Sequence, residues 1–356
     1  MKDGMNYAPQ GVKRVKAVQE GEFIFAASAL DHGHIHGMTQ ALIAAGGVCK
    51  YVYDPKPDRV ASFIKSFPDV KPANSLEEIL NDKDIHMVAA AGIPNVRCEL
   101  GLKVMQHDKD YFVDKCPFTT LEQLDEARKV HSETKRRYMV YYGERLHNEG
   151  GVFTGQLVHD GVIGKVVQVL GLGPHRLNPK SRPDWFFKKE QYGGIITDIG
   201  SHQVEQFLYY ANAKSAKVLH SKVGNFNNPE YPELEDFGDA TLLSDTGVTN
   251  YFRIDWFTPE ALPMWGDGRL FIVGTKGTIE VRKYMDIQRE NSGSHVFLTT
   301  DTVYEYHNVA GKVGCPFFGD LILDTLNRTE NAMTQEHAFL AAEVSMQAQK
   351  QAIKVA

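Results

Sequence analysis

The sequence predicts an α/β protein in which an N-terminal, doubly wound parallel sheet is joined to a C-terminal α+β part with a large, mostly antiparallel open sheet. Up to about residue 142, short apolar runs alternate with helical stretches, which is typical of βαβ units. Beyond that point, β-rich segments follow one another between turn signals. The length of 356 residues suits two domains of roughly 100–200 residues each.

The first half begins with Phe23–Ala27, an apolar run that ends in small residues and is typical of a buried strand. Gly46 and Gly47 end the helix that follows it. The expected strands of this half are 23–27, 48–53, 87–91, 111–113 and 138–142. The expected helices are 37–45, 59–67, 76–80, 95–106 and 121–134. Strands and helices in this alternation form a parallel sheet.

The second half is expected to contain an antiparallel or mixed sheet between two helices, 194–210 and 334–354. Its expected strands are 217–223, 239–243, 248–256, 269–273 and 278–281, separated by turn sequences such as Asp245-Thr246-Gly247. Glycines cluster near residues 143–151, which marks the boundary between the halves. We therefore expect an N-terminal arm at 1–21, a first domain at 22–145 and a second at 146–356.

The composition excludes several classes of protein. The formal charge of -6 leaves no basic excess to attract nucleic acid or an anionic membrane. No run of about 18 apolar residues occurs, so no membrane span is expected. The polar N-terminus lacks the apolar stretch of a secretory signal, so a cytoplasmic location is expected. The four cysteines stand far apart and form no CxxC pair: Cys49, Cys98, Cys116 and Cys315. The sequence therefore suggests neither a zinc knuckle nor a disulfide framework.

The loop after the first strand has features of a dinucleotide site. In such a site, glycine lets the backbone approach the pyrophosphate, and a helix N-terminus offers free N–H groups. If Gly33 is the middle glycine of a GxGxxG motif, Asp31 holds the first glycine position and His36 the third, so the motif is degraded. The loop residues expected to bind the cofactor are Leu30, Asp31, His32, Gly33, His34 and Ile35.

Asp54 strengthens this interpretation. It ends the second strand 21 residues after Gly33, close to the roughly 20-residue spacing of the acid that binds the adenosine ribose. A carboxylate there repels a 2′-phosphate, which favours NAD over NADP. The alternative is that Asp54-Pro55 is only a turn.

The histidines of the same loop allow a metal-site alternative. An aspartate followed by histidines two residues apart also opens metal-dependent amidohydrolases, where His32 and His34 would bind one metal ion. That class of protein needs an eight-fold βα barrel, whereas the second half of this chain is β-rich. We therefore expect no metal, with the histidines at the surface or facing phosphate.

Lys115 follows the strand at 111–113, so it emerges at the carboxyl edge of the sheet, where open α/β sheets bind ligands. A lysine there can donate a hydrogen bond to a substrate oxygen and favour its alkoxide form. The alternative is a solvated lysine before the turn at Pro117.

Asp198 and His202 stand four residues apart and share one face of the expected helix. Gly200 between them is unusual in a helix interior and fits a close approach to the backbone. Histidine titrates near neutrality, so His202 can take a proton from an alcohol and return it, with Asp198 positioning the imidazole or the substrate. The alternative is a structural Asp–His pair.

Together these stretches resemble the Gfo/Idh/MocA family, named after glucose–fructose oxidoreductase and inositol dehydrogenase. Lys115 matches the lysine of the family's E-K-P tripeptide, Asp198-x-Gly200-x-His202 matches its D-x-G-x-H motif, and Pro94-Asn95 matches its T-P-N segment on the nicotinamide side. Order and spacing agree over about 22–350. This chain departs in its glycine loop, in an extra residue between lysine and proline, and at Cys98, where the family commonly has histidine.

The resemblance implies reversible hydride transfer between NAD and a secondary alcohol of a sugar, glycoside or cyclitol. His202 would accept the hydroxyl proton, Lys115 would stabilise the alkoxide, and Asp198 would orient the substrate and the histidine. Further cofactor contacts are expected from Gly92, Pro94, Asn95 and Lys115. Substrate contacts are expected from Lys115, Arg145, His175, Arg176, Trp185, Asp198 and His202. Glu144, Arg182 and Asp184 offer further polar groups near the cleft, and Trp256 and Trp265 are further candidates for stacking on a sugar ring. Solvated charges and core tryptophans are the alternatives. Because the C-terminal sheet leaves one face open, a homodimer or a multiple of dimers is expected. A non-catalytic NAD-binding regulator on the same fold stays open.

Overall fold

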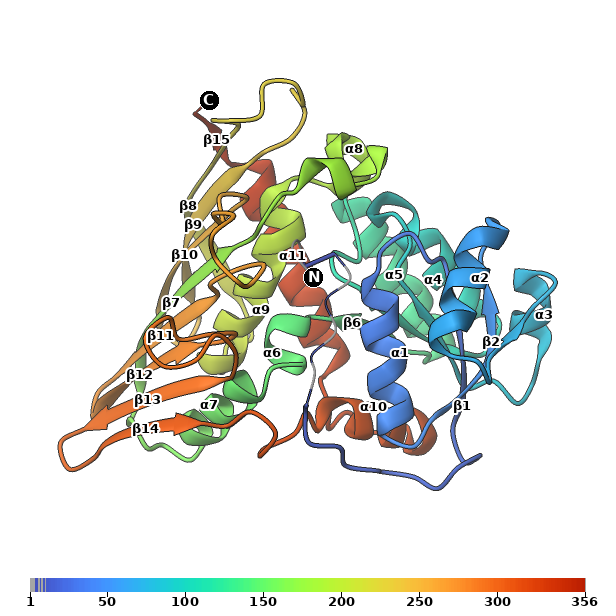
Figure 1. Ribbon diagram of the computed structural model, residues 1–356, viewed down its shortest axis with the longest axis horizontal. Coiled ribbons are helices and arrows are strands. Elements are labelled where there is room, and N and C mark those ends of the chain that lie inside the picture. The colour runs from blue at the N-terminus through green and yellow to red at the C-terminus, as the bar shows by residue number, and fades with distance from the viewer. Residues whose placement is uncertain (1–3, 6, 8, 10, 356) are drawn as a thin grey trace.

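Two β-sheets, of six and nine strands, organise the computed structural model of the chain (Figure 1). The structure describes residues 4, 5, 7, 9 and 11–355. The six-stranded sheet has the order β3-β2-β1-β4-β5-β6, and all its strands are parallel. Its strands are β1 (Ile24–Ser28), β2 (Val48–Tyr53), β3 (Lys71–Pro72), β4 (Met87–Ala90), β5 (Asp110–Asp114) and β6 (Tyr138–Tyr141). This is the Rossmann strand order, so the predicted parallel sheet is confirmed.

Helices connect these parallel strands. They are α1 (His34–Ala44), α2 (Pro57–Ser66), α3 (Leu76–Asn81), α4 (Arg97–Gln106) and α5 (Leu121–Thr134). Every residue of β4, β5 and β6 is buried, as expected for strands covered on both faces. A capping box fixes the start of α5, since Thr120 and Gln123 satisfy each other's backbone N–H groups. The carboxyl ends of the strands are thereby held at one edge.

The nine-stranded sheet is mostly antiparallel, with the order β14-β13-β12-β11-β7-β10-β9-β8-β15. Only the β7–β10 and β8–β15 pairs are parallel among its described strands. Its strands are β7 (Val166–Pro174), β8 (Ala216–Gly224), β9 (Phe237–Ser244), β10 (Thr249–Asp255), β11 (Arg269–Gly274), β12 (Gly277–Arg282), β13 (His295–Thr300), β14 (Tyr304–Asn308) and β15 (Ile353–Lys354). The predicted open, largely antiparallel sheet is confirmed.

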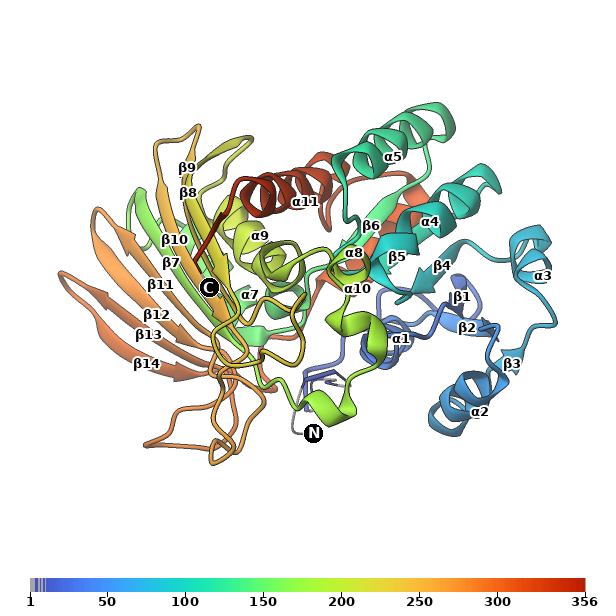
Figure 2. The same ribbon diagram turned by 90° about the horizontal axis from the view of Figure 1, so that it is seen from above.

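Helices fill the space between the two sheets, while the outer face of the nine-stranded sheet has no covering element in the described chain (Figure 2). These helices are α6 (Gly143–Leu146), α7 (Glu149–His159), α8 (Lys189–Tyr192), α9 (Ser201–Tyr210), α10 (Phe317–Asn327) and α11 (Gln335–Lys350). Helix α11 packs on β8 and α9 and also on α5 and β6, and α10 packs on α1. Helix α11 therefore joins the two sheets. None of the helices among residues 11–355 is long and apolar enough to cross a membrane.

Several elements differ from those expected, for local reasons. Helix α1 begins at His34 instead of residue 37. The helix expected at 194–210 starts as a π-helical turn, Ile196–Gly200, and continues as α9. Strand β7 was not predicted because Gly171 and Gly173 weaken its strand pattern. The other elements that the pattern missed include β3, β13, β14, β15, α7 and α10.

Candidate functional site

The turn after β1 contains the degraded glycine motif. Ala29 has a φ of 53°, in the left-handed region that favours glycine. Ala29 follows directly on β1, which ends at Ser28, so the chain turns there. Gly33 caps α1, with a helical φ of -66°. A middle glycine at the helix N-terminus is what the expected register requires, with Asp31 in the first glycine position, and that register stays a prediction.

The histidines of this loop hold its end against the sheet. The His32 N–H donates to the Ala91 carbonyl at 2.8 Å, and the His34 N–H donates to His32 Nδ1 at 3.2 Å. The Ile35 side chain lies in the core, so only its backbone can face a ligand. The N-terminus of α1 is thus placed at the carboxyl edge of the parallel sheet, where it can favour an anion.

Asp54, buried at the end of β2, is anchored by the backbone. It accepts the Leu30 N–H at 2.7 Å and the Lys56 N–H at 2.9 Å. Arg59 pairs with Asp31 and lies 3.5 Å from Asp54. Among the predicted residues, Asp31, Asp54 and Gly92 line one cavity at the ends of β1, β2 and β4. Pro94 and Asn95 form the turn before α4, and the Asn95 carbonyl accepts a hydrogen bond from Gln123.

Arg97 organises the segment that carries Lys115. Its side chain is fully buried, and it donates to the carbonyls of Gly92 at 2.7 Å, Asp114 at 3.1 Å and Cys116 at 2.9 Å. It also contacts the Lys115 carbonyl and the Asp114 carboxylate. One guanidinium therefore fixes the backbone on both sides of the predicted lysine.

Lys115 and Asp198 form a buried ion pair. Burial alone would lower the pKa of Lys115, but the charges of Asp198 and Asp114 raise it above its usual value. The lysine is therefore a cation that donates hydrogen bonds. The pair joins the end of β5 to the π-helical turn before α9.

His202 faces the same cavity from the first turn of α9. Burial lowers its pKa to about 3, against the opposing effect of the Glu144 charge, so the imidazole is neutral at pH 7. Its Nδ1 has no hydrogen-bond partner among the described residues. Gly200 allows close packing on β10, since a Cβ there would lie 3.3 Å from Phe252 and Ile254. The close approach expected at Gly200 is therefore made by the sheet.

A central cavity between the two sheets brings together many of the predicted residues: Lys115, Asp198, His202, His175, His32 and His34. Three other predicted residues, Arg145, Arg176 and Trp185, do not line this cavity. Arg145 pairs with Glu205 and lies 3.7 Å over the Tyr209 ring. Arg176 donates to the carbonyls of Pro259 and Leu262. Trp185 is buried beside the Phe186 ring, outside the cavity lining.

The cavity wall also includes Glu144, Arg182, Trp256 and Trp265, which the sequence offered as further polar or stacking candidates. Sequence reasoning missed other lining residues, including Tyr284 and, from the N-terminal segment, Gly4, Met5, Tyr7 and Pro9. The N-terminal segment gave no local signal, since its described residues reach the cavity through contacts that are distant in sequence. Tyr7, for example, packs on Trp265 at 5.4 Å between ring centroids.

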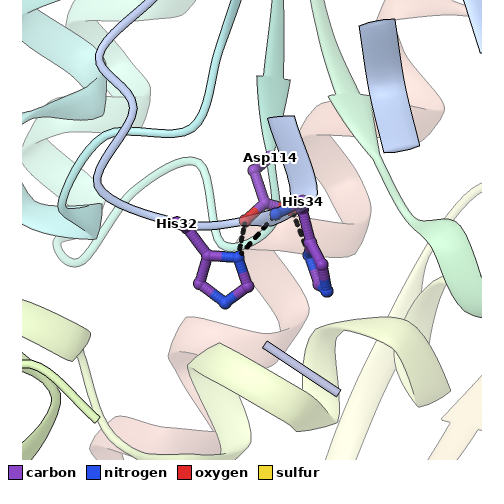
Figure 3. A group of neighbouring side chains, drawn as sticks. All are labelled: His32, His34 and Asp114. Atoms are coloured by element: carbon purple, nitrogen blue, oxygen red, sulfur yellow. Dashed lines mark hydrogen bonds and ion pairs between the residues drawn. The ribbon is translucent and has the colours of Figure 1, made fainter. Parts of the chain in front are cut away.

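His32, His34 and Asp114 form a cluster with ligand atoms within 4.8 Å of one another (Figure 3). His34 Nδ1 lies 3.0 Å from Asp114, and His32 Nδ1 lies 3.5 Å from it. The neighbouring histidine and Arg97 charges hold the pKa of Asp114 far below its usual range, despite burial, so His34 Nδ1 must carry the shared proton. A metal ion would have to displace that proton beside the Arg97 cation. The two-sheet fold also differs from the barrel of the metal-dependent alternative.

Two family models match most of the chain. Residues 33–142 match the model described as "Oxidoreductase family, NAD-binding Rossmann fold", and residues 154–280 match the "GFO/IDH/MocA C-terminal domain". Curated relatives include D-xylose dehydrogenase of Paenarthrobacter nicotinovorans, 24% identical over 36% of this chain and 34% of that protein. Another is the NADP(+)-dependent scyllo-inositol 2-dehydrogenase of Bacillus subtilis, 24% identical over 41% and 40%. The matches thus span well under half of each relative.

Solved structures extend the likeness over nearly the whole chain. A putative oxidoreductase from Erwinia carotovora atroseptica is 47% identical, with a TM-score of 0.91, covering 94% of this chain and all of that one. Levoglucosan dehydrogenase, solved with NADH and levoglucosan, has a TM-score of 0.77 at 15% identity, covering 93% of this chain and 97% of that one. The second comparison shows the shared fold alone.

Proposed function

Because the chain belongs to the Gfo/Idh/MocA family of NAD(P)-binding oxidoreductases, we propose that it transfers hydride between a nicotinamide cofactor and a secondary alcohol of a sugar, glycoside or cyclitol. One observation carries this proposal. Lys115, Asp198 and His202, which come from two different parts of the chain, line a single cavity beside the dinucleotide loop. The named substrates of the relatives, D-xylose, scyllo-inositol and levoglucosan, support the same class.

The residues of the loop fit a dinucleotide. Gly92 keeps a groove clear next to the turn, since a Cβ there would lie 3.2 Å from the Ala29 Cβ. The α1 N-terminus would hold the pyrophosphate, and Asp54 would hold the ribose at the far end. When bound, the nicotinamide supplies the hydride acceptor.

We assign a preference for NAD over NADP to the charge balance near Asp54. Asp31 and Asp54 contribute two negative charges, and Arg59, paired with Asp31, supplies one positive charge. The remaining negative charge disfavours a 2′-phosphate. Because Arg59 is engaged with both carboxylates, it is a poor partner for that phosphate.

The side chains of the cavity divide the remaining chemistry. Neutral His202 takes the proton of the substrate hydroxyl as the carbon gives up its hydride and becomes a carbonyl carbon. The Lys115 ammonium stabilises the negative charge that develops on the oxygen. Asp198 keeps Lys115 charged and in place. In the reverse direction, His202 returns the proton to the new alkoxide.

The open sheet face supports an assembly of two copies or a multiple of two. Gly171 faces Gln203 of α9, so its neighbour Leu170 faces outward. Leu170 lies opposite Tyr251 on one side and Phe271 on the other, and all three are half-exposed. An apolar row of this kind is normally buried against a partner.

A substrate screen tests the proposed reaction. The protein is incubated with NAD or NADP and a panel of free sugars, glycosides and inositols, and the absorbance of reduced nicotinamide is followed. Turnover of at least one polyol with NAD is expected. Cofactor binding without turnover of any panel member would contradict the proposal and favour a regulator on the same fold.

A further inference from the structure

Glu144, at the start of α6, presents a carboxylate with one occupied and one free oxygen. Its Oε2 accepts hydrogen bonds from Lys283 Nζ at 2.6 Å and Gln203 Nε2 at 2.9 Å. Its Oε1 is buried and has no hydrogen-bond partner among the described residues. Glu144 lines the central cavity together with His202 and His175. A buried acceptor in this position is a binding group for a donor that enters the cavity.

The fold holds this carboxylate in place. Gln203 directly follows His202 in α9, so the two side chains are positioned by the same helix turn. Gly173 of β7 leaves room for Gln203, because a Cβ there would lie 2.8 Å from its Nε2. Lys283 is almost fully buried and contacts the same carboxylate. The two donors fix the orientation of the Glu144 carboxylate and leave its Oε1 for another partner.

Glu144 is ionised in this setting. Burial alone would raise its pKa, but the Lys283 charge and the neighbouring imidazoles lower it to about 2. An ionised carboxylate accepts hydrogen bonds and donates none. Its free oxygen therefore recognises an N–H or O–H group.

His175 adds a second acceptor next to Glu144. Its Nδ1 lies 3.0 Å from the Gly173 carbonyl, so Nδ1 carries the proton and Nε2 accepts. Burial lowers the pKa of His175 to about 4, which keeps it neutral at pH 7. Its Nε2 lies 3.9 Å from Glu144 Oε1, too far for a direct bond and without a proton to share. Trp256 and Trp265 flank the imidazole with apolar surface.

We propose that Glu144 Oε1, with His175 beside it, binds a second hydroxyl of the substrate and so selects polyols over alcohols with a single hydroxyl. This inference rests on the proposed function, because His202 and Lys115 are taken to bind the reacting hydroxyl. The flanking tryptophans contribute apolar surface for the C–H groups of a ring. Glu144 is thus a specificity-determining residue of the site.

The experiment compares scyllo-inositol with cyclohexanol, a ring that carries one hydroxyl, in the wild type and in Glu144→Gln. The wild type should prefer the cyclitol in kcat/KM. The substitution should lower kcat/KM for scyllo-inositol by about 10- to 100-fold, the usual effect of losing one charge-assisted hydrogen bond. Cyclohexanol should be affected far less. Glu149→Gln is the matched control, since Glu149 is equally buried but binds the backbone of residues 311–314.

A Glu144→Gln protein that keeps the wild-type preference for the cyclitol would overturn the inference. If that variant does not fold, Glu144→Asp keeps the charge beside Lys283 but withdraws the free oxygen, and it should lower the same ratio. If no member of the substrate panel is oxidised, the proposed function fails, and calorimetric titration of the NAD-bound protein with scyllo-inositol tests the inference separately. In that titration, Glu144→Gln should bind scyllo-inositol more weakly than the wild type does. Equal affinity in the two proteins, or no binding to the wild type, would overturn the inference.

Discussion

Lys115 and Asp198 lie 83 residues apart in the chain and form a buried ion pair that connects the parallel sheet to the helix layer of the second sheet. Neither charge is stable there alone, because an unpaired buried charge costs several kcal/mol. The pair places a cation and an imidazole-bearing helix, α9, in one cavity. The proposed chemistry therefore depends on how the two sheets are joined, and the predictions below test separate parts of this arrangement.

Acid should destabilise the protein before its carboxylates titrate. Burial lowers the pKa of His147 and His202 to about 3, below the value of about 6.5 in an unfolded chain. Below pH 6.5 the unfolded chain takes up protons that the folded chain does not, so the free energy of unfolding decreases as the pH is lowered. By pH 4.5, two units below the unfolded pKa, each histidine should have cost about 3 kcal/mol.

Thermal unfolding between pH 7 and pH 4.5 measures this loss. His147→Gln removes one titrating group away from the central cavity and should make the dependence on pH shallower. A melting temperature that is flat over this range would contradict the buried, neutral state of these histidines.

NAD should bind at least about tenfold tighter than NADP, a difference of about 1.4 kcal/mol. Asp54→Asn should reduce the preference, because it removes one of the negative charges facing the 2′-position. Arg59→Ala should preserve or increase it, since the carboxylates then stand uncompensated. Fluorescence titration with both cofactors measures the ratio, and equal or tighter NADP binding by the wild type would refute the role of Asp54.

Arg97→Met should destabilise the fold by about 3–5 kcal/mol, because it leaves the buried Asp114 carboxylate without its guanidinium. Arg97→Lys restores a charge but not the several hydrogen bonds to the Lys115 segment. It should therefore recover part of the stability while kcat stays low. Denaturant unfolding and kcat measured on the same preparations separate the two effects, and full recovery of kcat by Arg97→Lys would show that the fork geometry is not needed.

Oligomerisation should depend on the outer row of the nine-stranded sheet. Light scattering is expected to give a dimer or a multiple of dimers, and Leu170→Glu should shift the mass toward the monomer. Ile287→Glu, in an exposed segment away from the named sheet strands, is the control and should leave the mass unchanged. A wild-type protein that stays monomeric at micromolar concentration would rule out this interface.

Local patterns were enough to predict the parallel strands and the positions of Asp54, Lys115 and the Asp198–His202 turn, because each depends on a nearby strand end or on a short spacing. The turn at Ala29 could not be predicted, since alanine gives no local signal for the positive φ that the backbone adopts there. Arg145 was expected in the cavity, but its partner Glu205 lies 60 residues away and holds it elsewhere.

The orientation of the Glu144 side chain could not be predicted from the local sequence either. Its orientation is set by Lys283, which is 139 residues away in the sequence. A pairing over that distance follows from the packing of β12 and the helices against each other. Only the assembled fold therefore distinguishes Glu144 from a solvated charge.

The most direct test of the account is single-turnover hydride transfer by His202→Ala with the best substrate from the screen. If His202 is the proton acceptor, the rate should fall by roughly 10²–10⁴-fold, the usual scale of general acid–base catalysis. Cofactor affinity and melting temperature, measured on the same preparation, should stay close to those of the wild type. A folded His202→Ala protein that transfers hydride at nearly the wild-type rate would contradict the proposed mechanism.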